Sequence, residues 1–139
     1  MARRISSEGD NGERVIIGLG IDISEIGRMR EAIERRGQAL VKRVFTPAEI
    51  AYCEQHRDPY ERFAARFAAK EAAMKALGTG WRHGVRWVDI EVARMPSGRP
   101  ELQLHGVAKQ IAAQMGVAHI SVSITHSGNI AFAEVIFED

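Results

Sequence analysis

The stretch Tyr60-Glu-Arg-Phe-Ala-Ala-Arg-Phe-Ala-Ala-Lys-Glu-Ala-Ala-Met-Lys-Ala-Leu77 is strongly helical and predicts one long helix. At about 100° per residue its largest apolar side chains share one stripe, formed by Phe63, Phe67, Met74 and Leu77. Glu71 lies only about 40° from Phe67 on that stripe. An unpaired carboxylate is unfavourable in apolar surroundings, so Glu71 is expected to be protonated, paired with a cation or bound to a metal.

Lys75 follows Glu71 by one helical turn and is its nearest candidate partner. One interpretation of the two residues is a partly exposed ion pair whose aliphatic stems lie against the apolar stripe. A second carboxylate, earlier in the chain, favours a different interpretation.

That carboxylate belongs to Val15-Ile-Ile-Gly-Leu-Gly-Ile-Asp-Ile23, which predicts a strand with apolar residues alternating onto one face. The other face carries Gly18, Gly20 and then Asp22. Glycines inside a strand indicate that a ligand or another backbone approaches closely. Asp22 has a simpler alternative as a residue near the N-terminus of a helix that Ser24 would open.

Asp22 at the end of a strand and Glu71 on a helix, with a lysine nearby, suit a Mg²⁺ site that also faces phosphate oxygens. Mg²⁺ typically takes only one or two protein carboxylates and completes its coordination with water and phosphate. His83 and His105 have no histidine or cysteine at ligand spacing, so the sequence carries no zinc signature.

The motifs around Asp22 and Glu71 resemble those of a known family, holo-acyl-carrier-protein synthase, the small bacterial type of phosphopantetheinyl transferase. The central matching motifs are Gly18-Leu-Gly-Ile-Asp-Ile23 with Glu25, Ile26 and Arg28, then Arg66-Phe-Ala-Ala-Lys-Glu-Ala72 and Lys75-Ala-Leu-Gly-Thr-Gly80. Further matches are Arg43-Val-Phe-Thr46 with Glu49, Asp89-Ile-Glu-Val92, Gly98-Arg-Pro100 and Ser121-Val-Ser-Ile-Thr-His126. The likeness runs from about Val15 to the C-terminus.

Composition fits a single domain. A chain of 139 residues with 45% hydrophobic residues can build one ordinary core, and no linker divides it. We expect residues 15–139 to form that domain and residues 1–14, which extend beyond the usual start of the resembled family, to be a flexible extension without a signal peptide. A net charge of +1 argues against a general nucleic-acid binder, and no apolar run is long enough for a membrane. The lone cysteine, Cys53, favours a reducing cytoplasm.

The order of elements predicts an α+β fold, with an antiparallel sheet packed against one long and several shorter helices, as the resemblance also implies. Thr46-Pro-Ala-Glu49 predicts a capping box at the start of a short helix. The expected helices span residues 24–36, 47–56, 60–77 and 107–115, and the expected strands span 15–23, 88–93, 101–104, 119–125 and 129–137.

The resemblance also implies roles for individual residues. Asp22 and Glu71 would hold the metal, and Lys75 would stabilise the transferring or leaving phosphate. The residues implied in coenzyme A binding are Arg66, Lys75, Gly78, Gly80, Gly98, Arg99, Pro100 and His126. Without the resemblance, the glycines would be a helix cap and a turn, Arg66 a surface charge, and His126 an ordinary turn residue.

The helix expected after the first strand has a basic exposed side. Arg28 and Arg35, with Arg36, Lys42 and Arg43 beyond them, make its exposed side basic, and Met29 adds an apolar contact. A solvated charged face is the simpler account. In the resembled family this helix receives acyl carrier proteins, which are acidic, so electrostatic steering of such a partner is the alternative.

The resemblance therefore implies Mg²⁺-dependent transfer of phosphopantetheine from coenzyme A to a serine of apo-acyl carrier protein, releasing adenosine 3′,5′-bisphosphate, in support of fatty acid biosynthesis. Either Glu71 or a water on the metal would take the serine proton. A homotrimer with sites shared between subunits is implied as well. The alternatives from other classes are a different metal-dependent nucleotide phosphoesterase and a non-catalytic module that binds carrier proteins.

Overall fold

The structure is a computed structural model that describes residues 12–78 and 84–139. Most of the expected N-terminal extension lies outside these residues, and so does Gly80 of the expected nucleotide site. The elements, in chain order, are β1 (Ile16–Glu25), α1 (Ile26–Arg36), α2 (Gln38–Val44), α3 (Pro47–Glu54), α4 (Pro59–Leu77), a 3-10 helix η2 (Trp87–Asp89), β2 (Ile90–Arg94), β3 (Pro100–Leu104), α5 (Gly106–Met115), β4 (His119–Ser127) and β5 (Ile130–Glu138).

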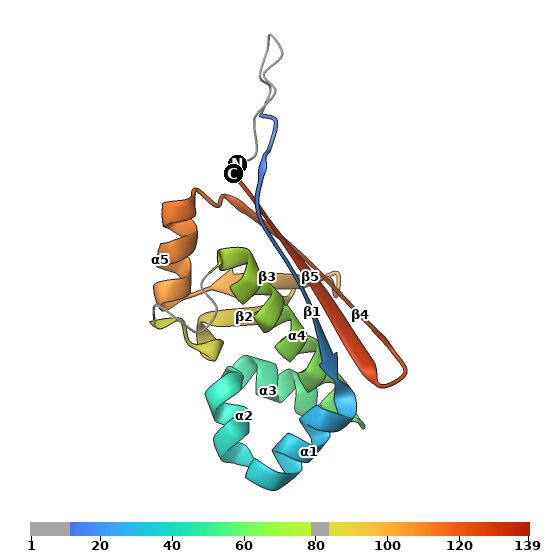
Figure 1. The fold of residues 1–139 in the computed structure, drawn as a ribbon. Helices are drawn as coiled ribbons and strands as arrows, with labels where there is room; N and C mark the ends of the chain where they lie inside the picture. Colours follow the sequence, from blue (N-terminus) through green and yellow to red (C-terminus); the bar gives the residue numbers. More distant parts are fainter. Residues whose placement is uncertain (1–11, 79–83) are drawn as a thin grey trace.

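The strands form two antiparallel sheets. One has three strands in the order β1-β5-β4, and the other is the β2-β3 hairpin. In the larger sheet, Asp22 of β1 pairs with Ala133 of β5. The first strand of the chain therefore lies beside the last one, which is the central strand of the sheet. Figure 1 shows α4 against this sheet and α1, α2 and α3 gathered at one end of the molecule. The predicted α+β class with antiparallel pairing is confirmed.

Helix α4 is buried on nearly all sides, not only along its aromatic stripe. It packs on β1 and β5 and also contacts the α1, α3, α5 and β2 segments. The alanines that separate its large side chains are fully or almost fully buried, among them Ala64, Ala68, Ala69, Ala72 and Ala73. Small side chains let neighbouring backbones come close, so α4 is the central element of the core rather than a helix that covers it.

The glycines of β1 serve this packing. A Cβ atom at Gly18 would lie 2.7 Å from the carbonyl oxygen of Ala76, and one at Gly20 would lie 1.8 Å from that of Ala72. Both distances are too short for any side chain. The close approach predicted at these glycines is therefore that of another backbone, the one of α4.

Because side chains alternate along a strand, the opposite face of β1 points away from α4. Leu19, Ile21 and Ile23 are 57%, 59% and 54% exposed, and Ile16 on the same strand is also exposed. We call these four residues the apolar strip. The glycine face is the buried one, which reverses the usual rule that the apolar face of a strand packs on the core.

Local signals predicted most of the boundaries. Thr46 and Glu49 form the expected capping box, in which the Thr46 hydroxyl accepts from the Glu49 amide and the Glu49 carboxylate accepts from the Thr46 amide. The prediction that Ser24 opens the next helix is wrong, because Ser24 is still in β1 and α1 begins at Ile26. The alternative role of Asp22 at that helix terminus is excluded for the same reason.

Helix α2 was not predicted. It is only seven residues long and follows Gly37 directly, whose φ of 64° lets the chain turn between two helices. Among the described residues, no helix is long and apolar enough to span a membrane.

Lys70 on α4 is fully buried, which is unusual for a lysine. Its Nζ atom donates to Glu49 Oε1 at 2.7 Å and to the carbonyl oxygens of Trp87 and Ile90. The second oxygen of Glu49 accepts from the amide of Val92 at 3.0 Å. Three acceptors, one of which is the opposite charge of Glu49, compensate the buried ammonium, and the pair connects α3, α4 and β2.

Candidate active site

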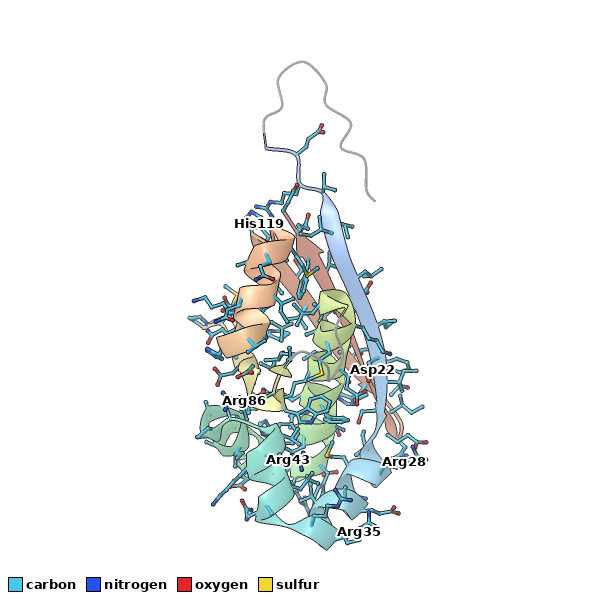
Figure 2. The ribbon with its side chains drawn as sticks, turned by 60° about the vertical axis from the view of Figure 1, so that its left-hand side comes forward. Asp22, Arg28, Arg35, Arg43, Arg86 and His119 are labelled. Carbon is cyan, nitrogen blue, oxygen red and sulfur yellow. The ribbon has the colours of Figure 1, made fainter. Side chains whose placement is uncertain are left out.

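Three predicted residues meet where β1 crosses α4. Asp22 points from β1 toward the helix, as Figure 2 shows, and its Oδ1 atom accepts a hydrogen bond from Lys75 Nζ at 2.8 Å. Lys75 Nζ also donates to the carbonyl oxygen of Ile21 at 3.0 Å. The ion pair of Lys75 is therefore with Asp22. Glu71, its expected partner one helical turn away, instead lies beside both charges.

The two carboxylates perturb one another. Burial, followed by the neighbouring Asp22 carboxylate, raises the pKa of Glu71 to about 8. Burial acts in the same direction on Asp22, but the Glu71 carboxyl group and the Lys75 ammonium together lower the pKa of Asp22 below its usual value. Two adjacent carboxyl groups with pKa values moved apart are typical of a functional site.

One oxygen in this cluster lacks a partner. Asp22 Oδ2 is buried and makes no hydrogen bond within the described part of the chain. A buried carboxylate oxygen without a donor is unfavourable, and a cation between Asp22 and Glu71 would satisfy it and offset their repulsion. Residues 12–78 and 84–139 contain no cluster of three or more metal-ligating side chains. Two carboxylates suit Mg²⁺, which leaves its other positions to water and phosphate.

Glu71 also lines the larger of two cavities that concern the site. This cavity, here called the Glu71 pocket, has a volume of about 690 Å³ and lies between α1, α2 and α4. Its walls are Ile23, Ser24, Glu25, Arg28, Met29, Ala32, Leu40, Val44, Phe45, Phe67, Glu71 and Ile130. A mostly apolar cavity that has Glu71 in its wall can bind an apolar side chain or chain segment next to the charged cluster.

The other cavity, here called the arginine pocket, has a volume of about 190 Å³. It is lined by Tyr52, Arg62, Ala65, Arg66, Val92, Arg94, Gly98, Pro100, Ile124, Thr125 and His126. Four of the predicted coenzyme A contacts therefore come together here, namely Arg66, Gly98, Pro100 and His126. Arg99 is exposed and does not line the pocket, and Gly78 lies at the left-handed C-cap of α4.

Charge dominates the arginine pocket. Arg66 is only 5% exposed, and its Nε atom has no hydrogen-bond partner within residues 12–78 and 84–139. His126 Nε2 lies 2.8 Å from Glu61 Oε1, and the same oxygen contacts Arg62 Nη1 at 3.0 Å. Guanidinium groups bind phosphate through paired hydrogen bonds, so a pocket with three arginines and a histidine fits a phosphate group.

The carboxylate cluster and the arginine pocket face different directions. Arg66 and Glu71 are five residues apart on α4, which places their side chains about 140° apart around the helix axis. None of the residues that line the arginine pocket belongs to the Asp22, Glu71 and Lys75 cluster. A single chain thus brings the predicted residues together as two groups rather than one.

The basic residues Arg28, Arg35, Arg36, Lys42 and Arg43 form a surface on α1 and α2, here called the basic surface. Figure 2 shows Arg28, Arg35 and Arg43 at the same end of the molecule. Arg28 pairs with Glu25 at 2.9 Å but its side chain is 84% exposed, so it remains available to a partner. Met29 is buried and reaches the Glu71 pocket, so any contact it makes with a partner is through that cavity.

Four residues of the arginine pocket region were not predicted from the sequence, namely Tyr52, Glu61, Arg62 and Arg94. Arg62 precedes Arg66 by one helical turn, a spacing that could have placed it on the same face. Tyr52 on α3 and Arg94 at the end of β2 carry no local signal, because only the packing of α3 against β2 brings them together.

Comparison with known proteins agrees with this geometry. The family model described as the 4′-phosphopantetheinyl transferase superfamily matches residues 18–133. The chain is 54% identical over 125 residues to a holo-[acyl-carrier-protein] synthase of Solibacter usitatus (strain Ellin6076), covering 90% of this chain and 100% of that protein. A homologue with the same name from Koribacter versatilis (strain Ellin345) is 51% identical over the same shares.

Solved structures give the same result. The crystal structure of a Neisseria meningitidis holo-[acyl-carrier-protein] synthase superposes with a TM-score of 0.81 at 33% identity, over 90% of this chain and 100% of that one. The Helicobacter pylori synthase, solved in complex with coenzyme A, has a TM-score of 0.76 at 30% identity, over 86% and 98% of the two chains.

Proposed function

The chain belongs to the 4′-phosphopantetheinyl transferase superfamily, as the resemblance of its motifs predicted, and we propose that it transfers phosphopantetheine from coenzyme A to a serine of apo-acyl carrier protein. The products are holo-acyl carrier protein and adenosine 3′,5′-bisphosphate. The Helicobacter pylori relative solved with coenzyme A supports this donor, and the name shared by the relatives supports the acceptor.

The observation that carries the proposal is the cluster of Asp22, Glu71 and Lys75. Asp22 and Glu71 would hold Mg²⁺, because their close carboxyl groups and the unsatisfied Asp22 Oδ2 atom call for a cation. When bound, the metal would neutralise the charge that builds up on the diphosphate oxygens. Lys75, whose ammonium group lies beside Asp22, would donate to a phosphate oxygen and stabilise the leaving group.

The arginine pocket would bind the other anionic part of coenzyme A. Coenzyme A carries a diphosphate, where transfer occurs, and a separate phosphate on its ribose. Since the diphosphate belongs with the carboxylate cluster, the ribose phosphate matches the pocket of Arg66 and His126. Gly98 and Pro100 form an uncharged wall of this pocket against which the nucleotide would lie. Three further contacts with coenzyme A are proposed from the family resemblance alone, namely Gly78, Gly80 and Arg99.

Arg28, Arg35 and the rest of the basic surface would receive the carrier protein. Acidic carriers are attracted to it before contact, which raises the rate of association and sets the orientation. The Glu71 pocket lies next to this surface and ends at the carboxylate cluster. A serine presented by a carrier docked on α1 would therefore approach the diphosphate from the side of Glu71.

A homotrimer with shared sites would unite the two groups of residues. They diverge by about 140° around α4 within one chain, so the arginine pocket of one subunit would complement the Asp22 and Glu71 cluster of its neighbour. The apolar strip of β1 supports such an assembly, because exposed apolar side chains at this density are typical of an interface. The number three comes from the family resemblance, and closed cyclic symmetry would make the sites equivalent.

We place the reaction in the cytoplasm, in support of fatty acid biosynthesis. Cys53 is a free thiol, and burial raises its pKa to about 12, which keeps it protonated and unreactive. This agrees with a packed residue in a reducing compartment.

One experiment tests the activity against its alternatives. The protein is incubated with coenzyme A, Mg²⁺ and an apo-acyl carrier protein, and the intact mass of the carrier is measured. We expect a gain of one phosphopantetheine group, which Glu71→Gln should abolish. Consumption of coenzyme A without a change in carrier mass would instead indicate a phosphoesterase. A stable complex with both substrates unchanged would indicate a binding module.

A further inference from the structure

Tyr52 on α3 lies between the two arginines that approach the arginine pocket from opposite parts of the chain. The guanidinium carbon of Arg66, on α4, is 4.0 Å from the centroid of the Tyr52 ring. That of Arg94, at the end of β2, is 4.8 Å from the same centroid. The Tyr52 hydroxyl also accepts a hydrogen bond from Arg94 Nη1. One aromatic side chain thus contacts both cations.

Arg94 is held from a second direction. Its Nε atom donates to the carbonyl oxygen of Gly98 at 3.2 Å, in the turn between β2 and β3. Gly98 has a φ of 89°, and a Cβ atom there would lie 2.9 Å from Arg94 Nη2. The turn therefore leaves room for the guanidinium group and helps to aim it at the pocket.

Arg66 is the residue in need of a ligand. Its side chain is almost completely buried, yet the described residues supply no carboxylate to pair with it, and its Nε atom lacks an acceptor. A buried guanidinium without an anion is unfavourable, and the face of Tyr52 compensates only part of the lost hydration. An anion in the arginine pocket would supply the remaining partner.

We propose that Tyr52 is a positioning residue, which holds the guanidinium groups of Arg66 and Arg94 as one binding pair for the ribose phosphate of coenzyme A. This rests on the proposed function. The stacking restricts two long side chains before the ligand arrives, so less conformational entropy is lost on binding. Arg94 is then a second phosphate ligand, and Tyr52 acts through the two arginines.

The test compares coenzyme A with dephospho-coenzyme A, which lacks the ribose phosphate. We measure kcat and KM for both donors with Tyr52→Leu, which removes the ring, and with Tyr52→Phe, which keeps the ring and removes the hydroxyl contact to Arg94. Tyr52→Leu should raise KM for coenzyme A about tenfold, as expected for the loss of desolvated cation–π contacts. KM for dephospho-coenzyme A, KM for the carrier and kcat should not change, and Tyr52→Phe should be intermediate.

A matched control is Tyr60→Leu, since Tyr60 also stacks on an arginine, Arg30 at 5.2 Å, but does not line the arginine pocket. It should leave both donors unaffected. If Tyr52→Leu does not fold, Arg94→Gln provides the same comparison and should raise KM for coenzyme A alone.

Equal changes in KM for both donors, or no change for either, would overturn the role of Tyr52. Failure of the wild-type protein to modify any carrier would overturn the proposed function instead, so the two failures are distinguishable.

Discussion

Gly20 of β1 lies so close to Ala72 of α4 that a Cβ atom at position 20 would be 1.8 Å from the Ala72 carbonyl oxygen. Asp22 follows Gly20 by two residues and therefore points to the same side of the strand, and Glu71 directly precedes Ala72. The contact between these two backbones is what brings the two carboxyl groups together. The close packing of β1 on α4 therefore also determines the position of the two carboxyl groups.

Gly20→Ala should damage both stability and activity. The backbones must separate to admit the methyl group, which typically costs about 1–3 kcal/mol. For a chain of this size, a loss of this kind lowers Tm by roughly 3–10 °C. Thermal unfolding and the transfer assay measure the two effects. Gly27→Ala in α1 is the control, because the atom nearest to its Cβ would be in the Asn129 side chain, at 3.3 Å, and not in a backbone. Equal Tm values for the two variants would contradict the packing role of Gly20.

Asp22→Ala and Glu71→Gln should each abolish transfer while the fold survives. Two protein carboxylates are already close to the minimum for a magnesium site, so loss of either removes the metal. Turnover measured across a Mg²⁺ titration, together with circular dichroism, checks this prediction. Glu101→Gln changes an exposed carboxylate on β3 and should have wild-type activity. Near-normal turnover of either site variant at limiting Mg²⁺ would disprove the metal assignment.

Stability without metal should depend on pH through Glu71. Its pKa is about 8 in the folded chain and 4.5 ordinarily, so the folded state binds the proton more tightly. The resulting stabilisation is complete below about pH 4.5 and is lost as the pH rises toward 8. In EDTA, Glu71→Gln should therefore gain Tm relative to the wild type between pH 5 and pH 8.5. Each 1 kcal/mol corresponds to roughly 2–4 °C.

The same Tm measurements are repeated with Mg²⁺ in place of EDTA. The metal should raise the Tm of the wild type at pH 8.5 but not that of Glu71→Gln, because a ligand stabilises only the state that binds it. A difference in Tm that stays constant with pH would mean that the folded chain does not raise the pKa of Glu71.

Arg28→Glu should raise KM for the carrier protein about tenfold, a change equivalent to ~1.4 kcal/mol, with little effect on KM for coenzyme A. The charge reversal repels an acidic partner and leaves the nucleotide contacts intact. High salt should reproduce the effect in the wild type. Lys109→Glu reverses an exposed charge on α5 and serves as the control. Equal increases in KM for both substrates would place Arg28 in the nucleotide site.

Light scattering should report three times the chain mass of 15.4 kDa. In a shared site, Glu71→Ala damages one half and His126→Ala the other, so mixed trimers of the two variants contain some intact sites. Mixing and reassembly should restore part of the activity that neither variant has alone. A monomer with full activity at assay concentrations would refute the shared arrangement and leave the metal chemistry untouched.

Much of this architecture is readable from local patterns. The alanine-rich run, the capping box at Thr46 and the alternating strands each depend on residues within one or two turns of the chain. The unpredicted helix α2 has seven residues, too few for a hydrophobic period to emerge. Ser24 illustrates the same limit, because the hydrogen bonds of β1 with β5 extend the strand past a residue whose side chain favours a helix start.

By itself, the sequence determined the two carboxylates, their elements and the family to which the chain belongs, because those features are encoded in contiguous motifs. Only the tertiary structure decided which partner each charge has. Lys75 pairs with Asp22 rather than Glu71, Lys70 is buried against Glu49, and Tyr52 joins arginines from two distant elements. Long side chains can reach several partners, and the choice among them depends on how the backbones pack, here on the glycine face of β1 against α4.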